Sequence, residues 1–237
     1  MTWSIIARDE TSGRVGIAVA TRFFAVGARV PHIKTGVGAV ATQAMTNPVF
    51  GPQGLALLGA GASAAEAVRM LLAGDEGREH RQLHIMDKAG QFGAATGKSC
   101  IPWCGHRIGE TFSVAGNMLV GPEVIEATAE AYKQQSGLPF AQRLLAAMQA
   151  GEAKGGDKRG RQSAALLIHD SEDHSALDIR VDDHAAPLDE LQRLEQVSRE
   201  RFIHVRRFGP TRDNPAGLID REALEAAVAK SIADGYV

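Results

Sequence analysis

The chain begins with two apolar segments that each alternate along their length. Residues 2–8 (TWSIIAR) and 15–20 (VGIAVA) are rich in branched and aromatic side chains, which favours strands, and DETSG between them predicts a turn. In the second segment the odd positions are Val or Ile, and the even positions are Gly or Ala. This small face predicts that another element packs closely against the strand.

Further strands are predicted wherever short apolar runs lie between turn residues. The KAG turn between two of these runs predicts a β-hairpin. The segments are 30–36 as a short candidate strand, then 37–44, 83–87, 91–96, 111–116, 163–169 and 176–182.

Helices are predicted in pairs between these groups of strands. Ser63 precedes an apolar stripe and Glu66 follows three residues later, which is the pattern of a capping box. The predicted helices cover residues 50–61, Ser63 to Gly74, Pro122 to the residue before Gly137, and Pro139 to Gly151, with two more beginning at Pro187 and Asp220.

The order of these elements predicts the fold class. Helix pairs grouped between runs of strands do not form alternating β-α units, which argues against a doubly wound parallel sheet. We expect an α+β fold, a four-layer αββα sandwich of two antiparallel sheets flanked by helices. Near residue 185 glycine becomes rarer and charge rises, so we expect a domain over 1–185. Residues 186–237 then form a C-terminal helical extension, packed on the domain or on a partner subunit.

Composition excludes several function classes. The net charge of −2 provides no strong field for nucleic acid or an acidic membrane surface, and 5% aromatic residues are too few for base-stacking platforms. The sequence contains no run that could span a membrane and no secretory signal pattern. Two cysteines indicate no disulfide framework, so we expect a cytoplasmic protein.

Seven blocks occur in order along the chain, namely ARDETSGRVGIAVATRFFAVGARVP, GAVATQAMTNPVFGPQGL, GREHRQLHIMD, GKSCIPWCGHRIGE, AGNMLVGPEVIEA, GGDKRGRQSAALLI and RVDDH. Over about residues 2–185 they resemble one bacterial family, the uncharacterised domain-of-unknown-function family 1028. The family is placed in the N-terminal-nucleophile (Ntn) hydrolase-like superfamily, so the resemblance implies the same αββα sandwich.

The resemblance to proteasome β subunits within that superfamily implies a catalytic group. Thr2 would become the N-terminal residue once Met1 is removed, and its hydroxyl would attack a carbonyl while its own α-amine acts as base. An α-amine has a reference pKa of about 7.7–8.0, so it can be neutral near pH 7. Arg22 would hold the site at positive potential, and Thr21 is a second candidate hydroxyl.

The same resemblance implies substrate-binding residues. Thr42 and Gln43 would lie near the reacting carbonyl, at the end of a strand that supplies an oxyanion-hole N–H, and Asn117 would make a polar contact. Asp157, Gln162 and Ser163 correspond to a turn before a late strand. Within GGDKRGRQS, the residues Lys158, Arg159 and Arg161 could meet a carboxylate or phosphate, although a solvated turn explains this loop equally well.

Other chemistry-bearing residues have simpler interpretations. Cys100, Cys104 and His106 have a tolerable spacing for zinc, but a structural site needs a fourth ligand, so we expect no metal. We expect the cysteines to pack as small hydrophobic side chains. The Asp182–His184 segment resembles a carboxylate–imidazole cluster, but a turn before the next helix explains it more simply.

The leading hypothesis is hydrolysis of amide or other C–N bonds in a small polar substrate, with no cofactor. The alternative is a non-catalytic scaffold that binds a ligand or assembles into an oligomer. We expect a small-molecule substrate or ligand, a homo-oligomer, and neither nucleic acid nor membrane as a partner.

Overall fold

The computed structural model describes residues 2–236, which form two compact units, residues 2–191 and 192–236. The larger unit contains two antiparallel sheets across the described residues. The first sheet has six strands, in the spatial order β10 (Leu177–Val181), β9 (Ser163–His169), β2 (Val15–Thr21), β1 (Thr2–Arg8), β8 (Phe112–Asn117) and β7 (Gly105–Ile108). The second has four, in the order β3 (Pro31–Lys34), β4 (Gly38–Ala44), β5 (Arg81–Asp87) and β6 (Phe92–Thr96).

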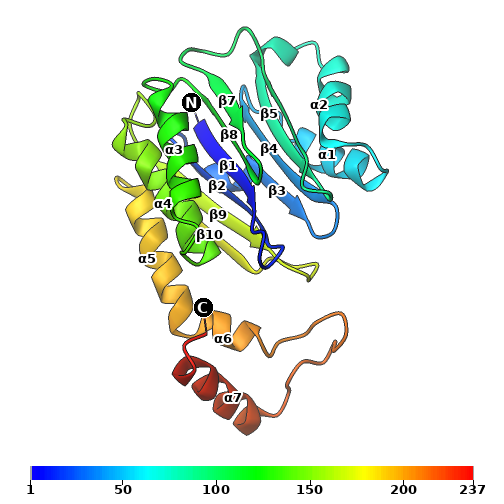
Figure 1. Ribbon diagram of the computed structural model, residues 1–237, viewed down its shortest axis with the longest axis vertical. Helices are drawn as coiled ribbons and strands as arrows, with labels where there is room; N and C mark the ends of the chain where they lie inside the picture. Colours follow the sequence, from blue (N-terminus) through cyan, green and yellow to red (C-terminus); the bar gives the residue numbers. More distant parts are fainter. Residues whose placement is uncertain (1, 237) are drawn as a thin grey trace. The chain divides into compact units, whose positions relative to one another are not determined.

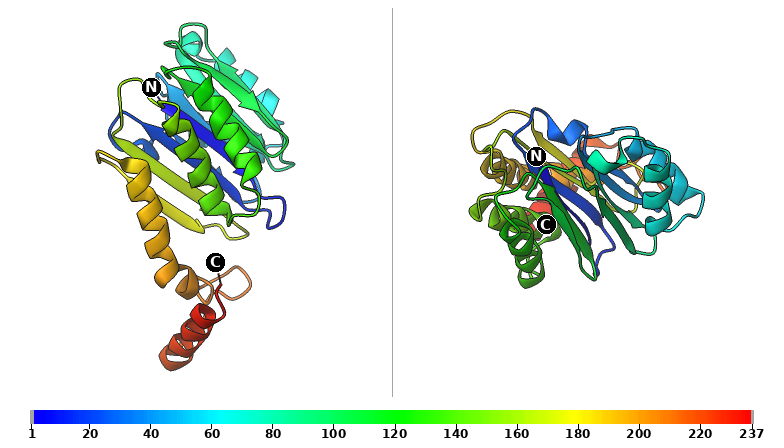
Figure 2. Two further views of the ribbon diagram at one scale, coloured as in Figure 1. Left: turned by 60° about the vertical axis from the view of Figure 1, so that its left-hand side comes forward. Right: turned by 90° about the horizontal axis from the view of Figure 1, so that it is seen from above.

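Helix pairs cover the outer face of each sheet, so the predicted α+β, four-layer αββα arrangement is confirmed (Figure 1). The four-stranded sheet carries α1 (Phe50–Gly59) and α2 (Ala64–Ala73). The six-stranded sheet carries α3 (Glu123–Gln134) and α4 (Phe140–Ala153). The right-hand view of Figure 2 shows the two sheets as separate layers between these helix pairs. Two 3₁₀ turns, η1 (Val26–Ala28) and η2 (Arg78–His80), lie in loops of this unit.

Local sequence signals explain several of these elements. The Ser63–Glu66 capping box begins α2 as predicted. The small face of β2 packs on α4, because a Cβ at Gly16 would lie 2.6 Å from Leu144 Cδ1. The prediction that α4 ends at Gly151 is wrong. That glycine lies inside the helix, where a side chain would collide with the Thr128 hydroxyl of α3.

The strand β7 is the main element that the sequence did not predict. It is short, lies at the edge of its sheet, and pairs only with β8 among the described strands. Two of its residues are exposed and two are partly buried, and the sequence GHRI lacks the alternation of apolar and polar positions that marks a longer strand.

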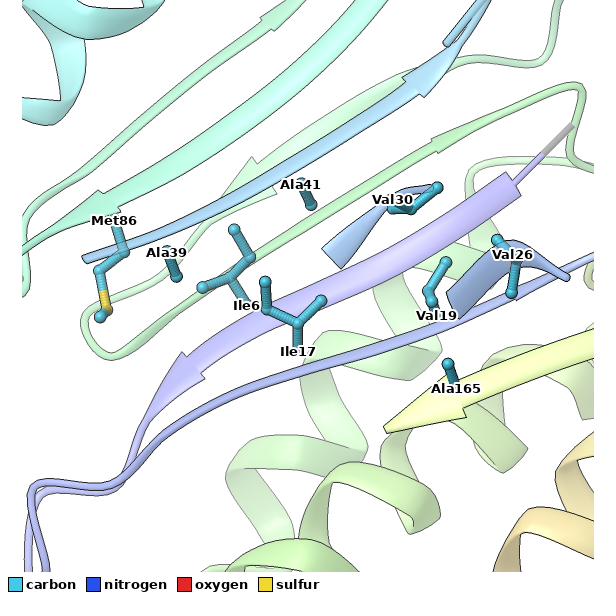
Figure 3. Close-up of a cluster of buried hydrophobic side chains, with 9 residues drawn as sticks. All are labelled: Ile6, Ile17, Val19, Val26, Val30, Ala39, Ala41, Met86 and Ala165. Carbon is cyan, nitrogen blue, oxygen red and sulfur yellow. The ribbon is translucent and has the colours of Figure 1, made fainter. Parts of the chain in front are cut away.

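An apolar cluster fills the space between the two sheets (Figure 3). The inward faces of β1, β2, β4, β5 and β9 supply most of it, and the segment after β2 adds the rest. Its buried members are Ile6, Ile17, Val19, Val26, Val30, Ala39, Ala41, Met86 and Ala165. Toward the Thr2 end of β1 this apolar layer gives way to polar side chains, and that change places the candidate site.

The C-terminal elements are helical, as predicted. Helix α5 (Pro187–Glu200) spans the boundary between the two units. The smaller unit continues with α6 (Phe202–Arg206) and α7 (Arg221–Ala233), which begins at the N-cap Asp220. Within it, the His204 ring contacts the Ser231 hydroxyl at 2.9 Å. None of the described helices is both long and apolar enough to cross a membrane.

Candidate functional site

Two threonine hydroxyls meet at one end of the six-stranded sheet. Strand β1 begins at Thr2 and β2 ends at Thr21, and their antiparallel register pairs Trp3 with Ala20. Because side chains alternate along a strand, Thr2 lies on the inward face with Ile6, and Thr21 lies on the inward face with Val19. The Thr2 hydroxyl donates to Thr21 Oγ1 at 3.2 Å. Two sequence-predicted candidates are therefore direct neighbours.

A cavity of about 170 Å³, which we call the threonine cavity, opens beside these two hydroxyls. Its walls come from the beginning of β1, the segment after β2 and the segment after β4. The lining residues are Thr2, Thr21, Phe23, Val26, Arg29, Val30, Ala44 and Thr46. Among these residues, only Arg29 carries a charge, and none is His, Asp, Glu, Cys or Lys.

Amide side chains hold the backbone of Thr2 from the opposite side. The Thr2 carbonyl oxygen accepts from Asn117 Nδ2 at 3.3 Å and from Gln43 Nε2 at 3.4 Å. Both amides also donate to Gln82 Oε1, at 3.0 Å from Asn117 and 2.8 Å from Gln43. Gln43 and Asn117 thus contact Thr2, but they support its backbone and do not line the threonine cavity.

This polar network continues between the sheets to a buried serine–histidine pair. Gln43 Nε2 faces carbonyl oxygens, so its Oε1 is free to accept the Ser4 proton at 2.6 Å. Ser4 Oγ must then accept from His84 Nε2, 2.8 Å away. Burial, together with the charge of His106, lowers the pKa of His84 to about 3. His84 is therefore neutral and donates to Ser4, so it does not activate Ser4 as a nucleophile.

Arg22, which the resemblance placed in the site, lies in a loop outside the threonine cavity. The Arg22 backbone N–H donates to Asp157 Oδ2 at 2.7 Å, and its guanidinium donates to the Arg159 carbonyl at 3.2 Å. Asp157 also accepts from the Arg159 N–H at 2.8 Å and is only 5% exposed. These bonds tie the loop after β2 to the loop before β9. The Arg22 side chain is exposed and is not part of the threonine cavity wall.

The remaining predicted binding residues are spread around the site. Thr42 lies on the opposite face of β4 and donates to the Asn47 carbonyl at 3.2 Å. Gln162 bridges elements, since its N–H donates to the Thr21 carbonyl at 3.1 Å and its amide donates to Asp183 Oδ1 at 3.1 Å. Ser163 donates to the Phe23 carbonyl at 2.5 Å, which orders the segment behind the cavity.

A second, smaller cavity of about 100 Å³ lies on the other side of Thr21. Arg161 lines it and forms an ion pair with Glu152 at 3.4 Å. Burial raises the pKa of Glu152, and the Arg161 charge opposes that change. The indole N–H of Trp3, another lining residue, has no hydrogen-bond partner among the described residues. Arg161 does not line the threonine cavity.

The cysteine–histidine segment forms no metal cluster within residues 2–236. Both Cys100 and Cys104 are free thiols, and burial is the main factor that raises the pKa of each. His106 Nδ1 contacts the Thr96 hydroxyl at 2.9 Å. In the Asp182–His184 segment, His184 Nδ1 accepts from the Ala186 N–H at 3.0 Å, next to the start of α5.

Sequence reasoning missed several residues of this region, among them Arg29, Ala44 and Gln82. Arg29 follows η1, several residues after Arg22, which the sequence analysis had proposed at the end of β2. Ala44 has a left-handed φ of 71°, which no sequence pattern signals for alanine. Gln82 had a usable signal, since it alternates with apolar residues in RQLHIMD and so points inward with His84.

Solved structures resemble this chain to different degrees. A crystal structure of protein SPO2555 from Silicibacter pomeroyi is similar, with a TM-score of 0.86, 31% identity, and coverage of 93% of this chain and 96% of that chain. Two Anbu (ancestral β-subunit) structures show a distant likeness. The one from Yersinia bercovieri has a TM-score of 0.41 and 12% identity, covering 83% of this chain and 95% of that chain. The Gly-1 mutant from Hyphomicrobium sp. strain MC1 has a TM-score of 0.42 and 14% identity, covering 85% of this chain and 97% of that chain.

A search of curated proteins found no match. A family model described as "Family of unknown function (DUF1028)" matches residues 2–191, and the similar Silicibacter pomeroyi structure carries the same family designation. The chain belongs to the DUF1028 family.

Proposed function

We propose that the protein is an Ntn-type hydrolase of amide or other C–N bonds in a small polar substrate. Thr2 is the nucleophile in this proposal, and it acts after Met1 has been removed. The observation that carries the proposal is the position of Thr2, whose hydroxyl contacts Thr21 at 3.2 Å on the wall of a cavity.

The cavity wall supports the α-amine of Thr2 as the base. A threonine hydroxyl is a weak nucleophile until a base within hydrogen-bond reach accepts its proton. The lining side chains include hydroxyls, apolar groups and Arg29, and an arginine stays protonated and cannot accept a proton. The free α-amine is attached to the same Cα as the reacting side chain, so it is held close to the hydroxyl.

The proposed reaction has two steps. Thr2 Oγ1 attacks the substrate carbonyl carbon while the α-amine takes the hydroxyl proton. The C–N bond then breaks, and the leaving nitrogen receives that proton, which leaves an ester on Thr2. A water molecule, deprotonated by the same amine, attacks the ester. The ester C–O bond then breaks, the amine returns the proton to Thr2 Oγ1, and the acid is released.

Neighbouring groups have supporting roles in this scheme. Asn117 and Gln43 fix the Thr2 carbonyl, and the Thr21 hydroxyl fixes its side chain, so the nucleophile is held before substrate binds. We assign stabilisation of the oxyanion to backbone N–H groups at the end of β4, where Ala44 and Thr46 line the cavity.

Covalent labelling by an acyl electrophile such as a β-lactone tests the proposal. The protein with a free Thr2 should gain one acyl group on Thr2. Thr2→Ala should gain none while remaining folded, with a loss of about 1 kcal/mol in the free energy of unfolding because the Thr21 hydrogen bond is removed. Thr2→Ser should still be labelled. The exposed turn residue Thr11 provides the matched control, so Thr11→Ala should label at the unaltered rate. Equal labelling of Thr2→Ala contradicts the proposal.

The alternative function is a ligand-binding or oligomeric scaffold without catalysis. Exposed apolar side chains near the cavity favour it, since Phe23, Phe24 and Met45 are 58%, 60% and 62% exposed. Exposed apolar groups of this size are common at binding surfaces. A scaffold tolerates Thr2→Ala and gives no acyl adduct, so the labelling experiment separates the two functions.

A further inference from the structure

Arg29, which the proposed reaction does not use, lies in the wall of the threonine cavity. It directly follows the η1 turn, and the backbone N–H of Arg29 donates to the Val26 carbonyl at 3.1 Å. This bond fixes the main chain from which the side chain extends. The guanidinium forms no hydrogen bond or ion pair with any other described residue. Its five N–H donors are therefore available to a ligand.

The charges around the cavity favour an anionic ligand. No Asp or Glu lines the cavity within the described residues, so Arg29 has no carboxylate there to neutralise it. The buried carboxylate of Asp157 is already used, because it accepts from the Arg22 and Arg159 backbones and pairs with the Arg159 guanidinium at 3.2 Å. A planar guanidinium binds a carboxylate through two parallel hydrogen bonds.

The rest of the lining sets the size and polarity of the ligand. Val26 and Val30 are 3% and 2% exposed, and together with Phe23 they supply an apolar surface within the cavity. The cavity volume of about 170 Å³ equals the liquid volume of about five or six water molecules. A short apolar stem between two polar ends has a size that this volume accommodates.

We propose that the threonine cavity binds small carboxylate-bearing amides, with the carboxylate on Arg29 and the amide carbonyl at Thr2. The carboxylate site is argued from Arg29 and its surroundings, and the placement of the amide rests on the proposed function. The substrate class is thus a short aliphatic acid that carries an amide at its far end.

Binding of glutaramate and of glutaramide to the full chain tests this proposal. The two probes differ in one end only, a carboxylate against a neutral carboxamide. Isothermal titration at low salt should give about tenfold tighter binding of glutaramate, because a hydrogen bond to a charged group adds that much discrimination. Arg29→Gln should remove the difference, and Arg29→Lys should keep part of it. Arg69→Gln, an exposed position on α2, is the charge-matched control and should bind like the parent protein.

The measurement needs no turnover, so it separates this inference from the proposed function. Binding of glutaramate that depends on Arg29, in a protein that hydrolyses no amide, supports the anion site and counts against the hydrolase. Turnover of glutaramate that requires Thr2 and is unchanged by Arg29→Gln supports the hydrolase and overturns the anion site. Equal affinity for the two probes, or no saturable binding of glutaramate, also overturns it.

Discussion

The hydroxyl oxygens of Thr2 and Thr21 lie 3.2 Å apart, although 19 positions separate the residues in sequence. The register of β1 and β2 brings them together, because one strand begins where the other ends. Both side chains are buried, at 7% and 1% exposure, yet both line a cavity. A hydroxyl pair held in this way at a cavity wall is the relationship on which the proposed function depends.

Replacing Thr21 with valine should slow acylation of Thr2 with little effect on stability. Valine has nearly the same shape but cannot accept the Thr2 hydrogen bond, so the nucleophile loses its fixed orientation. We expect a fall of about ten- to a hundredfold in the rate of labelling by an acyl electrophile. The free energy of unfolding should fall by about 1 kcal/mol. An unaltered labelling rate would show that Thr21 has no role in orienting Thr2.

Replacing Gln82 with methionine should destabilise the fold. Gln82 Oε1 accepts from Gln43 and Asn117, and its Nε2 donates to the Gly116 carbonyl at 2.8 Å. Methionine removes these three buried hydrogen bonds, which lowers the free energy of unfolding by about 2–4 kcal/mol in total. Urea unfolding measures this loss. Gln53→Met on the exposed face of α1 should change stability by less than about 0.5 kcal/mol, and an equal effect at the two positions contradicts the prediction.

The buried His84 should make the protein less stable in acid. Its pKa falls from 6.5 to about 3 on folding, mainly because burial disfavours the charged ring. Between these two values the unfolded chain binds a proton that the folded chain does not. The His84 contribution is therefore complete above pH 6.5 and is lost as the pH falls toward 3, by up to about 1.4 kcal/mol for each pH unit.

Comparison of urea unfolding in the parent and in His84→Gln across this pH range isolates that contribution. The variant should show a shallower dependence of stability on pH, whatever its absolute stability. His80→Gln at an exposed position is the matched control and should keep the steep dependence of the parent. Parallel curves for the parent and His84→Gln would contradict the assignment.

Adding a methyl group at Gly16 should disturb the packing of β2 on α4. A Cβ there would lie 2.6 Å from Leu144 Cδ1 and 2.9 Å from a ring carbon of Phe140. We expect Gly16→Ala to lower the free energy of unfolding by about 1–3 kcal/mol, as overpacked cores do. Gly74→Ala provides the comparison, since a Cβ there meets nothing within 4 Å. A larger loss at Gly74 than at Gly16 would contradict this account of the interface.

Much of the fold could be predicted because its signals are local. The Ser63–Glu66 capping box and the small even positions of β2 act within a few residues, and both predictions hold. Edge strand β7 was missed because its four residues carry no periodic pattern. Gly151 was misread as a helix end because its role is a close contact with Thr128, which a linear sequence does not reveal.

The candidate site was less predictable because its contacts join distant segments. Ser4 meets Gln43 across 39 positions and His84 across 80. The sequence pattern does not reveal which of these side chains meet. Arg22 and Arg29 lie on the same loop, and only the course of the η1 turn decides that Arg29 lines the threonine cavity.

The most direct test of the central claim is the intact mass of the protein purified from its native host. The proposed mechanism requires a free α-amine on Thr2, so we predict a mass lower by one methionine than that of the printed sequence. N-terminal peptide sequencing should then begin at Thr2. A mass that fully retains Met1 leaves the amine blocked and contradicts the Thr2 mechanism.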